Sequence, residues 1–137
     1  MRRLIGLAAL KVRNGPMRLC EVVESNGRLA GVYILYTARG KIAHAPQIVA
    51  RPNREREVVV SLLRLADDEG AAAVRGVVDQ NVLTGLAGVP RVFYHQGAAA
   101  IVFSRDAEIR AALREGKALI GGLIGERWSR LVADPFD

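Results

Sequence analysis

The stretch KIAHAPQIVARPNREREVVVSLLRLADDEGAAAVRGV, residues 41–77, decides the fold class of this chain. Its first ten residues predict a strand, and Pro46 within them predicts a bulge, an edge or a splay because proline donates no N–H to a neighbouring strand. A helix that ends at Gly70 follows, with one apolar face formed by Val59, Leu62, Leu63 and Ala66. The apolar run 71–77 predicts a buried strand with a parallel partner. This order of elements indicates an α/β domain.

The start of the helix is the first candidate site. We expect Asn53 to cap it, with Glu55 and Glu57 in the first turn, where the helix dipole favours acidic side chains. The N–H groups at a helix start have no partners within the helix and can bind an anion.

Three arginines next to this helix start, at positions 51, 54 and 56, suggest a cradle for a pyrophosphate. The alternative is an ordinary capped helix whose solvated arginines are offset by Glu55 and Glu57. No glycine-rich phosphate loop is present between Arg51 and Val58, which favours this alternative when composition alone is considered.

The segments on either side predict further elements around this core. Before it we expect a helix over 3–13 and a hairpin of strands 17–24 and 28–38, because Asn26-Gly27 supports a tight turn. After it we expect a short helix capped by Asp79, a second hairpin over 91–96 and 98–104, a helix capped by Ser104, and a tail in which Trp128 docks onto the body. No repeat or linker interrupts the chain, so we expect residues 1–137 to form a single domain, whole or partial.

Composition narrows the classes of function. The 137 residues are 50% hydrophobic and carry a net charge of +6, which suits a globular domain with an anionic partner. Aromatic residues make up only 5%, and the arginines are scattered, so we rank nucleic-acid binding last. No apolar run is long enough to span a bilayer, and the segment after Arg2 and Arg3 is too short for a signal peptide.

Cys20 is the chain's one cysteine, and we expect it to be a buried small hydrophobe. With His44 and His95 as the only histidines, a zinc cluster is excluded and no metal is expected. This cysteine usage fits a reducing compartment, so we expect a cytoplasmic protein. His44 suits a structural role in its strand, and Tyr94 is a weak candidate for a proton donor.

Four segments together resemble GNAT-type acyltransferases, in particular the C-terminal region of bacterial GNAT-like proteins. They are GRLAGVYILY (27–36), APQIV (45–49), GAAAVRGVVDQNVL (70–83) and FSRDAEIRAALREGKALIGGLIGERW (103–128), within a similarity that covers roughly residues 17–130. The resemblance implies a mixed, mostly antiparallel sheet flanked by helices, with the parallel strands 41–50 and 71–77 splayed around an acyl-CoA.

The resemblance also implies roles for individual residues. The pyrophosphate would meet the junction from Arg51 through Asn53 and Arg54 to Arg56, and the pantetheine arm would lie along the backbone of Gln47, Ile48 and Val49. Tyr94 is the nearest counterpart of the family's general acid, although it lies one element late. The family's spaced glycines are absent from 51–58, and most of its N-terminal half has no counterpart.

Two functions follow as expectations. The first is an acyl-CoA-dependent N- or O-acyltransferase, or its cofactor-binding half, acting on an amine or hydroxyl acceptor. The alternative is a GNAT-shaped interaction or regulatory module without catalysis, which the missing glycines and missing half favour. Such a module would pair with a partner chain or form a homo-oligomer through the open edge of its sheet.

Overall fold

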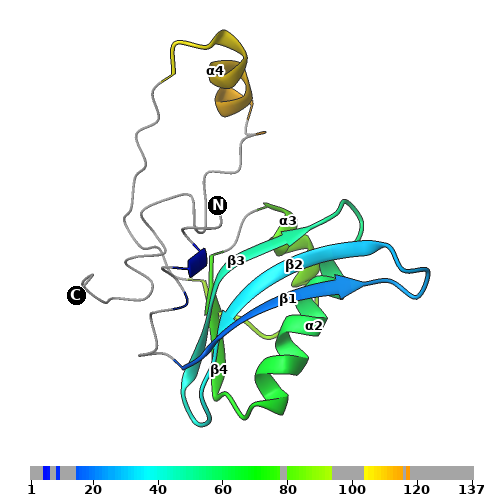
Figure 1. Cartoon of the computed structure of the whole chain (residues 1–137), viewed down its shortest axis with the longest axis vertical. Coiled ribbons are helices and arrows are strands. Elements are labelled where there is room, and N and C mark those ends of the chain that lie inside the picture. Colours follow the sequence, from blue (N-terminus) through cyan, green and yellow to red (C-terminus); the bar gives the residue numbers. More distant parts are fainter. Residues whose placement is uncertain are drawn as a thin grey trace.

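The computed structural model describes residues 5, 6, 9, 15–77, 80–93, 104–115 and 117. Over these residues the chain forms a four-stranded mixed sheet flanked by helices, as the sequence predicted (Figure 1). The strands lie side by side in chain order: β1 (Met17–Val23), β2 (Leu29–Tyr36), β3 (Ile42–Ala50) and β4 (Ala73–Gly76). The helices are α2 (Glu55–Asp68), α3 (Gln80–Gly85) and α4 (Ala107–Arg114).

The predicted first hairpin is confirmed. β1 and β2 are antiparallel, and Gly27 takes a φ of +79° in the turn between them. The Asn26 side chain stabilises this turn, because its oxygen accepts the backbone N–H of Arg28 at 2.9 Å.

β3 contains the bulge that Pro46 predicted. Gln47 lies opposite Ile34 and His44 lies opposite Tyr36, so two β3 residues, Ala45 and Pro46, face one β2 residue between them. The bulge sets which face each side chain takes. Ala45 before it and Ile48 after it both pack against the core beneath α2, although they are three residues apart.

α2 packs on the sheet through β2 and β3 (Figure 1). Its buried residues are Val58, Val59, Leu62 and Ala66, so the apolar face is turned slightly from the predicted one, with Val58 in place of Leu63. Gly31 on β2 makes the close approach possible: a Cβ there would lie 2.3 Å from the Val49 carbonyl oxygen and 2.6 Å from Val58 Cγ2. The helix ends at Gly70, whose φ of +73° confirms it as the stop.

β4 is parallel to β3, as predicted, but it is shorter and less buried than expected. Its pairing runs from Ala73, opposite Ile42, to Gly76, opposite Ala45. Ala73 and Gly76 are exposed and the two residues between them are half-buried. The expectation of a buried strand was wrong because β4 is the edge strand of the described sheet.

The C-terminal expectations have mixed outcomes. α4 is present, but its cap is Asp106 rather than Ser104: the Asp106 carboxylate accepts the backbone N–H groups of Glu108 and Ile109. Residues 91–93 are not in a strand. Most of the helix over 3–13, the Asp79 cap, the rest of the second hairpin with Tyr94, and Trp128 lie outside the described residues. Within the described part of the chain, no helix has the length and apolarity to cross a bilayer.

Candidate functional site

The candidate site lies where β3 leaves β4 and leads into α2. The parallel pairing of the two strands stops at Ala45, yet β3 continues to Ala50, and α2 begins five residues later at Glu55. Along this last part of β3, no strand among the described residues pairs on the side of β4. Pro46, which is fully buried, is the first β3 residue beyond this pairing.

Asn53 does not cap α2 as predicted. The residue at the cap position is Arg54, and no side chain bonds to the first turn from there. Asn53 instead takes a φ of +65°, a left-handed conformation that asparagine tolerates better than most residues other than glycine. Its backbone N–H donates to Glu55 Oε1 at 3.2 Å, so Glu55 closes the turn.

The arginines of the junction are held by an acid from another part of the chain. Glu24, at the end of the first hairpin's leading strand, lies with Oε1 3.0 Å from Arg54 Nε and 3.5 Å from Arg51 Nη1. Arg54 also pairs with Glu57 at 3.2 Å. The Glu24 side chain is only 12% exposed, whereas those of Arg51 and Arg54 are 44% and 40% exposed. Both guanidinium groups therefore remain open to solvent on their outer sides.

Burial alone would raise the pKa of Glu24. The hydrogen bond and charge of Arg54, the hydrogen bond of Asn26 and the charge of Arg51 outweigh that effect and lower the pKa below its usual 4.5. Glu24 is therefore ionised at neutral pH and keeps its hold on both arginines.

Arg56 contacts a different element. Its Nη1 donates to the Ala87 carbonyl oxygen at 2.6 Å, just beyond α3. Gly85 allows α3 to sit against the start of α2, because a Cβ there would lie 2.7 Å from the Glu55 carbonyl oxygen. Arg56 thus fixes α3 beside the junction. Arg51 Nη1 likewise donates to a backbone carbonyl oxygen, that of Leu29, at 3.2 Å.

The three β3 residues expected along a cofactor arm lie on the part of the strand past the bulge. Gln47 and Val49 share the face of the sheet away from α2, while Ile48 packs against the core beneath α2. Val49 is 39% exposed. The structure thus brings the residues proposed for the pantetheine arm and those proposed for the pyrophosphate into one continuous segment, 47–56.

A row of polar residues crosses the face of the sheet away from α2, next to the end of the pairing between β3 and β4. Tyr36 on β2, His44 on β3 and Arg75 on β4 occupy opposed positions, so we call them the cross-strand row. Opposed side chains on adjacent strands have Cβ atoms about 5 Å apart. The sequence alone did not reveal this row, because it depends on the register of three strands.

Within the cross-strand row, burial shifts two ionisation equilibria. Burial raises the pKa of Tyr36 to about 12. Burial, with a smaller contribution from the charge of Arg75, lowers the pKa of His44 below its usual 6.5. His44 Nδ1 is buried and has no hydrogen-bond partner. The imidazole is therefore neutral at pH 7.

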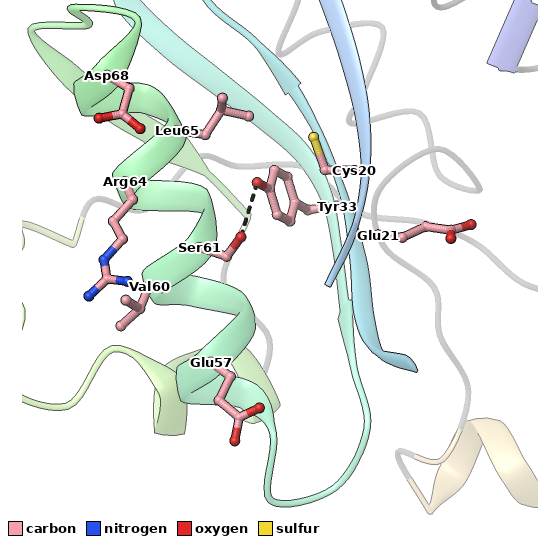
Figure 2. Close-up of a pocket in the computed structure, with 9 residues that line it drawn as sticks. All are labelled: Cys20, Glu21, Tyr33, Glu57, Val60, Ser61, Arg64, Leu65 and Asp68. Atoms are coloured by element: carbon pink, nitrogen blue, oxygen red, sulfur yellow. Dashed lines mark hydrogen bonds between the residues drawn. The ribbon is translucent and has the colours of Figure 1, made fainter. Parts of the chain in front are cut away.

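A separate groove, of about 610 Å³, lies between β1, β2 and the outer side of α2 (Figure 2). Figure 2 shows Tyr33 pointing towards Ser61, and their hydroxyl oxygens are 3.4 Å apart. The groove is lined by Cys20, Glu21, Tyr33, Glu57, Val60, Ser61, Arg64, Leu65 and Asp68. Cys20 is half-buried here rather than fully buried as expected.

Comparisons with known proteins add no assignment: no family model, no curated protein and no solved structure gave a significant match to this chain. Among the described residues, no three histidine, cysteine or acidic side chains gather as a metal site would require. Tyr94, the proton donor suggested by the resemblance, lies outside the described residues.

Proposed function

We propose that the protein binds an acyl-CoA at the junction of β3 and α2 and transfers the acyl group to an amine or hydroxyl, as GNAT-type enzymes do. The observation that carries the proposal is the continuation of β3 past its parallel pairing with β4, straight into the start of a helix. An extended ligand that hydrogen-bonds along Gln47–Val49 would deliver its phosphates to that helix start.

Charge at the junction supports a phosphate ligand. The α2 start has no side-chain cap, so its first N–H groups can donate hydrogen bonds to an anion. Arg51 and Arg54 flank it with partly exposed guanidinium groups. Asn53 turns the chain into the helix with a left-handed backbone, a conformation that glycine usually supplies.

Glu24 provides the sharpest test, because it competes with a phosphate for both arginines. Glu24→Gln should strengthen the binding of CoA by about two- to fivefold in calorimetry, as expected for release of partly exposed ion pairs. Glu21→Gln removes the same charge from an exposed position on β1 and should leave the affinity unchanged. Arg51→Gln should weaken binding.

Hydrogen exchange locates the ligand independently. Acetyl-CoA should protect the amides of residues 51–58 and leave those of α4 unaffected. Absence of both heat and protection with protein in excess of the CoA would overturn the proposal.

The second candidate is the module without catalysis. It is favoured by a specific observation: the arginines of the junction already have partners within the chain, Glu24 for two of them and the Ala87 carbonyl for Arg56. If Glu24→Gln and the native protein both fail to bind CoA, these contacts serve to hold the hairpin and α3 against α2, and this candidate is preferred.

A further inference from the structure

β1 is the longer of the two edge strands of the described sheet. It runs for seven residues, whereas β4 at the other edge runs for four. Figure 1 shows β1 as the outermost strand, with β2 between it and β3, and no described strand pairs with its outer side. The backbone N–H and C=O groups along such an edge can pair with a strand of another chain.

The side chains of β1 alternate between the two faces of the sheet. Cys20 and Val22 pack against the core beneath α2. Figure 2 shows Cys20 pointing towards Tyr33 and Glu21 pointing to the opposite side of the strand. Leu19 and Val23 share that opposite side with Glu21, and they are 53% and 55% exposed. This face of the edge strand therefore carries two uncovered apolar side chains with one acid between them.

The spacing of these side chains selects one register for a pair of β1 strands. Two copies related by a two-fold axis can pair antiparallel around any residue of the strand. A centre on Glu21 sets Leu19 of each copy opposite Val23 of the other, so the exposed apolar side chains cover one another. A centre on Cys20 would set Leu19 opposite Glu21 instead, and a centre on Val22 would set Val23 opposite Glu21. Centres on Leu19 or Val23 would leave the other of these two residues opposite a position outside β1.

The same register suits the face that carries α2. Cys20 of each copy lies opposite Val22 of the other, and both are half-buried apolar side chains. Arg18 of each copy lies opposite Glu24, which follows the strand, so opposite charges meet at both ends of the pairing. Because neighbouring strands lie about 4.8 Å apart, the β1 of the second copy would extend the wall that Cys20 forms in the groove.

The two Glu21 carboxylates meet at the centre of this pairing. Like charges opposite one another on adjacent strands destabilise the pair. Glu21 is exposed, so its charge weakens the association without preventing it. This arrangement has a signature that a general apolar contact lacks, because removal of the Glu21 charge should tighten the association.

We propose that β1 is the surface through which two copies of this chain associate, with their β1 strands antiparallel and centred on Glu21. The two sheets then become continuous, and the α2 helices of both copies lie on the same face. The inference does not rest on the proposed acyl transfer, and its test needs no ligand.

Disulfide crosslinking of the full chain tests the register. Cys20→Ser removes the chain's one cysteine and provides the background. Opposed residues of an antiparallel pair have Cα atoms about 4.5–5.5 Å apart, within the reach of a disulfide. Glu21→Cys should therefore crosslink with itself under mild oxidation. An equimolar mixture of the Leu19→Cys and Val23→Cys proteins should crosslink, whereas each protein alone should not. Val92→Cys, at a position 88% exposed and outside any strand, gives the background from random collision.

Sedimentation equilibrium tests the charge at the centre. Glu21→Gln should tighten the association about two- to fivefold. Asp67→Asn removes the same charge from an exposed position on α2 and should leave the association unchanged. A native protein that stays monomeric at every concentration overturns the proposal. Crosslinking of Leu19→Cys alone to the extent of the mixture, or no tightening by Glu21→Gln, overturns it as well.

Discussion

Gly31 is the residue on which the packing of α2 against the sheet most directly depends. An alanine at this position would place its Cβ 2.3 Å from the Val49 carbonyl oxygen, and backbone cannot yield as a side chain can. We expect Gly31→Ala to lower the free energy of unfolding by about 1–3 kcal/mol, measured by urea denaturation. Gly6→Ala is the control, because nothing lies within 4 Å of a Cβ there, and it should show no such loss.

The free energy of unfolding should fall in two separate steps as the pH drops, one caused by His44 and the other by Glu24. The folded-state pKa of His44 is below 6.5, so the unfolded chain binds this proton more readily, and stability falls as the pH drops from 6.5 through the lowered pKa. The pKa of Glu24 is below 4.5, so its contribution is lost only on further acidification.

Urea unfolding between pH 2 and pH 8 separates the two steps. His44→Asn should remove the step at higher pH and leave the step at lower pH. An unchanged upper step in that variant would mean that another group titrates there.

The role of a single residue was hardest to predict from the sequence where the backbone geometry determines that role. The sequence placed Asn53 and the three arginines at a junction of strand and helix, where the structure has them, because a helix start follows from local pattern. It could not show that Asn53 adopts a left-handed turn instead of capping, since asparagine suits both. Glu24 was missed because it reaches the arginines only through the folding of the first hairpin.

At the scale of elements, α4 depends on one cap. The Asp106 carboxylate accepts two backbone N–H groups of the first turn, at 2.8 and 3.3 Å, whereas Ser104 Oγ accepts only the N–H of Asp106. We expect Asp106→Ala to destabilise this helix by about 0.5–2 kcal/mol, seen as faster exchange of the Glu108 and Ile109 amides. Ser104→Ala should have the smaller effect, and equal effects would contradict the assignment of the cap.

Elements with strong periodicity were predicted well. The first hairpin, β3 with its bulge and α2 with its glycine stop all follow from short-range pattern. The burial of β4 did not follow from short-range pattern. An apolar run such as AAAV suits an interior strand and a small-residue edge strand equally. Which one it becomes depends on how many strands the sheet has, and no local signal gives that number.

At the scale of the whole molecule, β1 is an edge strand of the described sheet that carries two exposed apolar residues, Leu19 at 53% and Val23 at 55%. Such edges favour pairing with another chain. We therefore expect concentration-dependent self-association in sedimentation. Leu19→Lys should weaken it, whereas Val92→Lys, at a position 88% exposed and outside any strand, should not. A monomer at all concentrations would contradict the homo-oligomer.

The candidate site was predictable in part at this scale. The junction proposed for the phosphates is local in sequence, so its residues could be named from the sequence. The cross-strand row was not, because Tyr36, His44 and Arg75 come together only through the pairing of three strands, one of them beyond a 14-residue helix. His44 was judged structural because a lone strand histidine gives no sign of what faces it.

The bulge at Pro46 adds one residue to β3 without changing which residues form the core. Ala45 before it and Ile48 after it face α2, and Gln47 and Val49 face away, which is the alternation of a regular strand with one residue inserted. Deleting Pro46 would leave every other side chain on its present face and restore an N–H where proline has none. A single-codon deletion would thus yield a protein of nearly the same core, whose third strand runs through this point without a bulge.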